Sequence, residues 1–149
     1  MSAPGPFPPH VERVRDEWID YNGHLSEAYY VLVFGFATDA AMAHLGMDAA
    51  YRESTGCSLF SVEVHVRYLD QVAPGVDLEV RTQVIGGDAK RLRLWHEMWS
   101  QGRLRATEEV MALHVDTGAG RTAPFPRAVA DDIAARAITP PADAGRSIG

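Results

Sequence analysis

The sequence predicts an α+β domain in which one long buried helix is wrapped by a curved antiparallel sheet. Three observations indicate this: a mostly apolar run after Ser26, four strand-like runs downstream of it, and short connections with turn residues between those runs. The sheet is the only predicted element large enough to cover the helix.

The helix is predicted over about Ser26–Leu45. Ser26 suits the N-cap, Glu27 suits the positive end of the helix dipole, and Gly46 suits the position after the C-cap. Apolar residues cover nearly the whole circumference, which is typical of a helix buried on all sides. They are Tyr29, Tyr30, Leu32, Val33, Phe34, Phe36, Ala37, Ala40, Ala41 and Met42.

Strands are predicted before and after this helix. Val11–Trp18 mixes apolar and charged residues and is expected to form the first strand. The four later runs alternate apolar and polar residues, as half-buried antiparallel strands do. They are Ser58–Leu69, Val76–Ile85, Arg91–Ser100 and Leu104–Val115. Turns at 73–75, 86–88 and 101–102 predict a meander of sequential strands, and a short helix is expected over Pro126–Ala137.

Composition indicates one domain, over residues 11–137. The 149 residues are 46% hydrophobic, and the segments 1–10 and 138–149 are rich in proline and glycine and are expected to be flexible tails. A net charge of -6 disfavours nucleic-acid binding. The longest apolar run, Ala28–Ala37, is too short to span a membrane, the single Cys57 cannot form an internal disulfide, and no secretory leader is recognisable. We therefore expect a cytoplasmic protein with no nucleic-acid or membrane partner.

A cluster of polar residues lies just before the predicted helix. Asp20, Asn22, Gly23 and His24 fall within five positions there. A helix N-terminus leaves amide N–H groups unpaired and can stabilise a polarised carbonyl or an oxyanion. The backbone amides around Gly23, His24 and Leu25 are the expected hydrogen-bond donors to such an oxygen. The segment therefore predicts a site for acyl chemistry.

The motif Asp-x-x-Gly-His in Trp18–Tyr30, at the start of a long buried helix followed by a meander, resembles the hotdog-fold acyl-CoA thioesterases of the 4-hydroxybenzoyl-CoA thioesterase type. More narrowly, the runs 61–69, 90–92 and 113–117 resemble the betainyl-CoA thioesterases of carnitine catabolism, which sometimes occur fused to carnitine dehydrogenase. The likeness covers about residues 11–122 and includes no dehydrogenase Gly-x-Gly-x-x-Gly loop. It implies hydrolysis of a small acyl-CoA, foremost betainyl-CoA to betaine and free CoA, with no cofactor besides the CoA of the substrate.

The resemblance carries over to Asp20, Asn22, Gly23, His24 and two helix tyrosines, Tyr29 and Tyr30. Because the chain has no Gly-x-Ser-x-Gly elbow, a carboxylate is expected to attack. Asp20 is that candidate, as a nucleophile that forms a mixed anhydride or as a general base for water; the alternative is a turn aspartate that bonds backbone amides. His24 either bonds the thioester carbonyl or holds the turn, and Asn22 either caps the turn or contacts substrate.

A trimethylammonium acyl group would require aromatic faces. Trp18 and Tyr21, which flank Asp20, are the foremost candidates, followed by Tyr29 and Phe60. Tyr30, Phe34 and Phe36 are interpreted as core residues instead. Glu63 lies among valines, where it either contacts the substrate head group or faces solvent.

Basic residues are needed for the phosphates of CoA. Lys90, Arg91 and Arg93 beside the Gly86-Gly87 turn form the densest basic cluster, and Arg67 is the next candidate; the alternative is a solvated surface. The histidines His24, His44, His65, His96 and His114 lack the spacing of a metal site, and none is predicted.

Competing functions stay open at this point. They are a thioesterase for another short or aromatic acyl-CoA and a non-catalytic acyl-CoA-binding or sensing domain. A hotdog hydratase is disfavoured because the Asp20–His24 spacing is one residue shorter than the hydratase motif. An open sheet edge predicts self-association, and the resemblance implies a dimer or tetramer with active sites shared between subunits.

Overall fold

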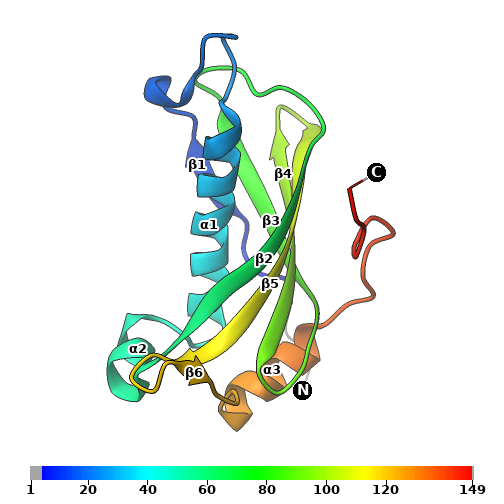
Figure 1. Cartoon of the computed structure of the whole chain (residues 1–149). Coiled ribbons are helices and arrows are strands. Elements are labelled where there is room, and N and C mark those ends of the chain that lie inside the picture. The colour runs from blue at the N-terminus through cyan, green and yellow to red at the C-terminus, as the bar shows by residue number, and fades with distance from the viewer. Residues whose placement is uncertain (1–4, 149) are drawn as a thin grey trace.

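The computed structural model of the chain describes residues 5–148. Its long helix α1 lies across one face of a curved antiparallel sheet (Figure 1), which confirms the predicted α+β fold. The strands are β1 (His10–Arg13), β2 (Cys57–Tyr68), β3 (Asp77–Gly87), β4 (Arg91–Ser100), β5 (Arg103–Asp116) and β6 (Arg121–Thr122). The helices are the 3-10 turn η1 (Asp16–Trp18), α1 (Glu27–His44), α2 (Ala49–Thr55) and α3 (Arg127–Arg136).

The bounds of α1 confirm the predicted helix to within one residue at each end. Ser26 is the N-cap residue, although its side chain makes no capping hydrogen bond. Gly46 follows the C-cap with φ +85°, a left-handed conformation that glycine adopts without a steric penalty. At about 1.5 Å per residue the helix is roughly 27 Å long and runs the length of the sheet.

The predicted meander is only partly correct. The strand order is β1-β3-β4-β5-β2, so β3, β4 and β5 form the meander, while β2 pairs with β5 and occupies an edge. The connection 69–76 is not a hairpin, because the Leu69 and Asp70 amides both donate to the Arg105 carbonyl and Val72 accepts from Leu25. Register shifts in β2 between Ser61 and Glu63 and at two other points bend the sheet around α1.

The predicted strand Val11–Trp18 is too long. The ladder with β3 ends at Arg13, and the chain then enters η1, where the Trp18 amide donates to the Arg15 carbonyl. The turn buries the Trp18 side chain, which is 4% exposed. Burial of this large ring outweighs the continuation of strand pairing.

The helix α1 is not covered on every side in the single subunit. Tyr30, Val33, Phe34 and Ala37 face the sheet and are buried, whereas Val31 and Leu32 are about 40% exposed. The short helix α2 was not predicted, although Asp48 caps it by accepting a hydrogen bond from the Tyr51 amide. No single helix of residues 5–148 is long and apolar enough to cross a membrane; only α1 and α2 together, with a 66° bend, pass that test by length and composition.

Both chain ends make specific contacts within the described residues. Phe7 is buried in the core at the C-terminal half of α1. The Ile138 amide donates to the Val84 carbonyl, and Asp143 pairs with Arg67 at 3.1 Å. The predicted tail residues 1–4 and 149 lie outside the described part, and the flexibility of both ends stays a prediction.

Candidate functional site

The segment between η1 and α1 is a tight loop held by backbone hydrogen bonds. The Asp20 amide donates to the His24 carbonyl and the Gly23 amide donates to the Asp20 carbonyl, each at 3.0 Å. Gly23 has φ +78°, and a Cβ added there would meet nothing within 4 Å, so the requirement for glycine is conformational and not steric. Leu25 and Ser26 then tie the loop to Val72 and Trp18. The loop therefore fixes Asp20 at the N-terminus of α1.

The Asp20 carboxylate is positioned by a hydrogen bond and not by an ion pair. Its Oδ1 atom accepts a hydrogen bond from the Asn22 backbone amide at 2.8 Å. Within residues 5–148 the side chain has no ion-pair partner. The turn interpretation and the catalytic interpretation are therefore both compatible with this geometry, since one oxygen holds the turn and the other is free.

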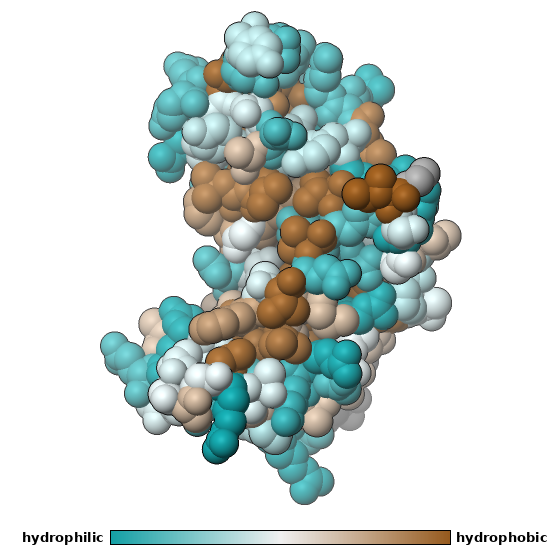
Figure 2. Space-filling view, in the orientation of Figure 1, coloured by the Kyte–Doolittle hydropathy of each residue, from teal (hydrophilic) through white to brown (hydrophobic). Residues whose placement is uncertain are grey.

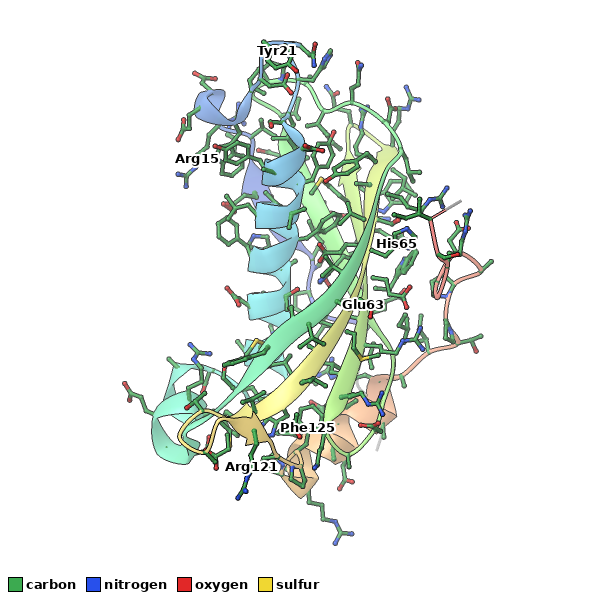
Figure 3. The ribbon with its side chains drawn as sticks, viewed as in Figure 1. Arg15, Tyr21, Glu63, His65, Arg121 and Phe125 are labelled. Carbon is green, nitrogen blue, oxygen red and sulfur yellow. The ribbon has the colours of Figure 1, made fainter. Side chains whose placement is uncertain are left out.

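An open groove of about 780 Å³ lies directly beside this carboxylate. It runs between the loop, the first turn of α1 and the end of β2. Its lining residues are Asp20, Tyr21, Asn22, Leu25, Ser26, Glu27, Tyr30, Tyr68, Leu69, Asp70 and Gln71. Of the predicted site residues, the structure brings Asp20, Tyr21 and Asn22 together here. Tyr21 stands at the tip of the molecule and is 98% exposed (Figure 3).

The expected oxyanion donors need correction. The amides of Gly23 and Leu25 already donate to the carbonyls of Asp20 and Val72, so neither is available to a substrate. The free donors are instead the amide of His24 and the first two amides of α1, on Glu27 and Ala28, which have no hydrogen-bond partner among the residues described. They lie at the positive end of the α1 dipole and can stabilise a negative oxygen.

Three predicted residues lie next to the loop but do not line the groove. Trp18 stacks on Tyr29 with ring centroids 5.5 Å apart, and the Arg15 guanidinium lies over the Trp18 ring. The two rings thus pack on each other beside α1, and their predicted contact with substrate is not supported by this arrangement. The half-buried His24 side chain makes no hydrogen bond within the described structure, so its bond to a thioester carbonyl stays a prediction.

Glu63 and Phe60 are not part of this groove in the same subunit. Figure 3 shows Glu63 and His65 pointing from β2 to the side of the sheet opposite α1. Phe60 pairs with Leu113 and Glu63 pairs with Met111, on the same outer face. The bulge between Ser61 and Glu63 shifts the alternation by one residue, which the sequence pattern did not reveal.

The predicted CoA-binding residues lie in two different places. Lys90 and Arg91 are at the β3–β4 turn, where the Lys90 carbonyl accepts from the His114 amide and the Ala89 carbonyl accepts from Phe125. Phe125 packs with the C-terminal half of α1, at the opposite end of the molecule from Tyr21 (Figure 3). Lys90 and Arg91 are therefore remote from Asp20 in one subunit.

Arg67 lies close to the groove along the chain but on the outer face of β2. It lines a second cavity of about 400 Å³ together with His65 and Arg146 from the C-terminal segment. Asp143 forms ion pairs with both Arg67 and Arg146, at 3.1 Å and 3.2 Å. Arg146 was not predicted, because nothing in the sequence links residue 146 to a strand eighty residues earlier.

The groove also contains two tyrosines that sequence reasoning did not assign to substrate. Tyr68 was counted as a strand residue and Tyr30 as core. Their rings meet edge to face with centroids 5.0 Å apart, and their hydroxyls donate to the backbone carbonyls of Glu27 and Asp70. Alternation in β2 put Tyr68 on the helix side of the sheet, but only the fold shows that Tyr68 reaches the loop of Asp20.

Two buried titratable side chains lie on the face of the sheet that α1 covers. The His96 ring bonds the Thr38 and Thr82 hydroxyls at 2.8 Å and 2.7 Å, and burial lowers its pKa to about 3. Glu108 lies beside it on β5, and burial raises the pKa of its carboxyl to about 8. His96 is thus neutral near pH 7, whereas Glu108 carries its proton over much of the physiological range.

An apolar strip borders the groove along α1 and the edge strand β2. Figure 2 shows apolar side chains gathered over these two elements. Val62, Val64 and Tyr68 on β2 are each about half exposed, as are Phe60 and Leu69. The second edge of β2 has no partner strand among residues 5–148, so an apolar strand with free backbone groups is open to another chain.

The chain is similar to known proteins in both sequence and structure. The model of the thioesterase-like superfamily matches residues 14–133. The chain is 45% identical to the betainyl-CoA thioesterase of Pseudomonas aeruginosa, across 91% of this chain and 90% of that protein. It is also 45% identical to the L-carnitine dehydrogenase/betainyl-CoA thioesterase of Agrobacterium fabrum, across 87% of this chain but 27% of that longer protein. A Staphylococcus aureus protein solved in complex with CoA has a TM-score of 0.90, with 28% identity, 100% coverage of this chain and 98% of its own.

Proposed function

This chain belongs to the thioesterase-like superfamily and has the hotdog fold, and from that premise we propose that it hydrolyses betainyl-CoA to betaine and free CoA. The observation that carries the proposal is the free carboxylate oxygen of Asp20 in a groove at the N-terminus of α1. Support for the acyl group comes from the 45% identity to a betainyl-CoA thioesterase over nearly the full length of both chains.

The reaction begins with the thioester carbonyl over the unpaired amides of α1. Its oxygen accepts from the free N–H groups at the helix start, which include those of Glu27 and Ala28, while its carbon faces Asp20. As the carbonyl carbon becomes tetrahedral, negative charge grows on that oxygen, and the helix N-terminus stabilises it more strongly than the neutral carbonyl.

Asp20 can then act by either of two routes. As a nucleophile, a carboxylate oxygen forms a bond to the acyl carbon, the C–S bond breaks, and CoA thiolate leaves an anhydride that water hydrolyses. As a general base, the same oxygen removes a proton from a water molecule that attacks the carbonyl. Both routes yield betaine and CoA thiol, and neither needs a cofactor.

We extend the proposal to a homodimer that forms through the edge of β2. The exposed apolar side chains Val62 and Val64 and the unpaired strand edge favour pairing with a second copy. A two-fold axis at this edge would make the two β2 strands antiparallel and bring opposite ends of the two subunits together. Glu63, Phe60 and the Lys90–Arg91 turn would then act on the Asp20 of the partner.

For the phosphates of CoA we favour Arg67 and Arg146 within one subunit. Both line the cavity on the outer side of β2, and that cavity shares Tyr68 and Leu69 with the groove of Asp20. Since Asp143 already pairs with both guanidinium groups, a phosphate would have to compete with this carboxylate.

The test is a substrate panel for the purified protein, with release of free CoA thiol followed over time. The panel contains betainyl-CoA, its uncharged isostere 3,3-dimethylbutanoyl-CoA, acetyl-CoA and benzoyl-CoA. We expect the highest kcat/KM for betainyl-CoA. A higher value for acetyl-CoA or benzoyl-CoA would contradict the assigned acyl group, and binding without thiol release from any substrate would favour an acyl-CoA-binding domain.

A further inference from the structure

Glu108 is a buried acidic side chain that the proposed hydrolysis does not use. It is 3% exposed, and within residues 5–148 its carboxyl group has neither a hydrogen-bond partner nor an ion-pair partner. Its chain neighbour Glu109, by contrast, pairs with Arg93 on the outer face of the sheet. An unpaired carboxyl in this environment destabilises the fold, which suggests that it is retained for a ligand.

Glu108 does not itself line the groove, but it lies on the same face of the sheet as Tyr68, which does. Glu108 lies opposite Val66 on β2 and opposite His96 on β4, so its side chain is on the face that α1 covers. Tyr68, two residues beyond Val66, is on the same face and lines the groove beside Asp20. The partner of Tyr68 on β5 is the small Ala106, which leaves room for the tyrosine ring over the sheet.

Glu108 and Tyr68 interact electrostatically. The negative charge of Glu108 is one of the causes that raise the pKa of the Tyr68 hydroxyl, after burial and the charge of Glu27. Because Val66 pairs with Glu108 and Tyr68 pairs with Ala106, the Tyr68 and Glu108 side chains are diagonal neighbours on one face of the β2–β5 pair, within reach of one ligand. Tyr30 fixes the Tyr68 ring through the edge-to-face contact and is itself anchored to the Asp70 carbonyl.

No cation in the described structure neutralises Glu108. Burial keeps His96 uncharged near pH 7, and Arg105 pairs with the Asp70 carboxylate at 3.2 Å. A ligand with a fixed positive charge, such as a quaternary ammonium, would stabilise the ionised form of this carboxyl group, and it would offer no proton to compete for hydrogen bonds. Its methyl groups require aromatic or apolar contacts, which Tyr68 provides.

We propose that Glu108 and the face of Tyr68 form the subsite for the quaternary ammonium of the acyl group. The inference rests on the proposed betainyl-CoA hydrolysis and adds the residues that select a cationic acyl chain. In this role Glu108 and Tyr68 take the place of Trp18 and Tyr29. In betainyl-CoA the nitrogen is separated from the thioester carbonyl by one methylene, so the subsite must adjoin the position where Asp20 attacks.

The experiment compares Glu108→Gln with the wild-type protein on betainyl-CoA and on 3,3-dimethylbutanoyl-CoA. These acyl groups have the same shape and differ in charge. We expect Glu108→Gln to lower kcat/KM for betainyl-CoA by at least about 10-fold, mainly through KM, because a buried charge partner is lost. The uncharged isostere should be hydrolysed as well as before or better, since glutamine is nearly isosteric and needs no ionisation.

The matched control is Glu109→Gln, which makes the same substitution one residue away on the opposite face. It should leave the ratio of the two kcat/KM values unchanged. A second variant, Tyr68→Leu, removes the aromatic face and should reduce the preference for betainyl-CoA by about 2- to 30-fold, the range of one cation–π contact. Thermal unfolding of each variant separates a folding defect from a change in selectivity.

The outcomes separate a failure of the proposed subsite from a failure of the proposed substrate. If the wild-type protein shows no preference for betainyl-CoA over the isostere, the proposed substrate fails before any variant is considered. If that preference is present and survives in Glu108→Gln, the substrate stands and the subsite is overturned. An equal loss for both substrates would assign Glu108 to chemistry or folding and would also overturn the subsite.

Discussion

The backbone amide of Asp20 donates to the carbonyl of His24 at 3.0 Å, which closes the five residues of the motif into one loop. This bond places the Asp20 side chain and the free His24 amide on a rigid support at the N-terminus of α1. The spacing between Asp20 and His24 therefore follows from the loop geometry. A longer segment with Gly23 at the bend could not form the hydrogen bond between the Asp20 amide and the His24 carbonyl.

Replacement of Gly23 tests the role of this loop. We expect Gly23→Ala to cost about 1 kcal/mol of unfolding free energy, because alanine disfavours φ +78°, and to lower kcat/KM by more than 10-fold as Asp20 loses its position. Chemical denaturation and the thiol-release assay measure the two effects. Gly56 is the matched control, since it has φ +69° at the end of α2 and a Cβ added there would likewise meet nothing within 4 Å. Gly56→Ala should cost similar stability and leave activity unchanged; equal losses of activity would contradict the role of the loop.

The proposed dimer makes a separate prediction about the edge of β2. Val62→Lys puts a charge on an apolar edge residue that is 55% exposed and should dissociate the dimer in sedimentation velocity experiments. Activity should fall by at least about 10-fold if the sites are shared between subunits. Val11→Lys is the control, since Val11 is 59% exposed on the opposite sheet edge. A Val62→Lys protein that stays dimeric would rule out this edge as the interface.

His96 predicts a loss of stability in acid. Its pKa is about 3 in the folded protein and about 6.5 in the unfolded chain, so between these values the unfolded state binds the additional proton. The contribution of His96 to stability is therefore complete above about pH 6.5 and declines as pH falls toward 3, by up to about 1.4 kcal/mol per pH unit. Urea unfolding at pH 7.5, 6 and 5 measures this slope. In His96→Gln, the change of unfolding free energy with pH should be smaller by the contribution of one bound proton. An unchanged slope would show that His96 is not the responsible group.

Glu108 predicts that substrate binding becomes tighter as pH rises. With its pKa at about 8 the free protein holds a neutral carboxyl at pH 7, and a bound quaternary ammonium favours the ionised form. The KM for betainyl-CoA should therefore fall as pH rises from 6 to 9, while the KM for 3,3-dimethylbutanoyl-CoA should not follow it.

The groups that face Glu108 do not reproduce this trend. Tyr68 on β2 and His96 on β4 are the neighbours of Glu108, and Tyr30 and Glu27 on α1 adjoin Tyr68. Burial raises the pKa of both tyrosines above the ordinary value of a tyrosine hydroxyl, and His96 titrates near 3. Glu108→Gln should abolish the pH dependence of KM; a dependence that persists in this variant would assign it to another group.

Much of the fold was predictable because local patterns and tertiary structure agree. The end signals Ser26 and Gly46 defined α1 to within one residue, and turn residues defined β3, β4 and β5. The position of β2 beside β5 was not predictable from short connections, because the segment 69–76 crosses the end of the sheet and is fixed by bonds to Arg105 and Leu25. Glu63 faces away from α1 together with His65, as the solvent-facing alternative predicted, whereas the bulge between Ser61 and Glu63 was not predictable.

The candidate site was predictable where residues are adjacent in sequence and not where distant strands meet. Asp20 and Asn22 share the groove because one loop carries them. Tyr68 and Glu108 come from β2 and β5, and only the register between these strands places them on the same face. Arg146 reaches Arg67 through the C-terminal segment, which has no periodic pattern that would reveal its path.

The central claim is that the Asp20 carboxylate performs the hydrolysis, and the most direct measurement is kcat/KM of Asp20→Asn on betainyl-CoA. Asparagine keeps an oxygen that can accept from the Asn22 amide, so the loop and the melting temperature should be preserved. Asp16→Asn, a change of the same kind in the exposed turn before the loop, serves as the control. We predict a loss of about 10³-fold for Asp20→Asn with substrate binding retained, and no change for Asp16→Asn. A folded Asp20→Asn protein with kcat/KM within 10-fold of the wild-type value would contradict the account.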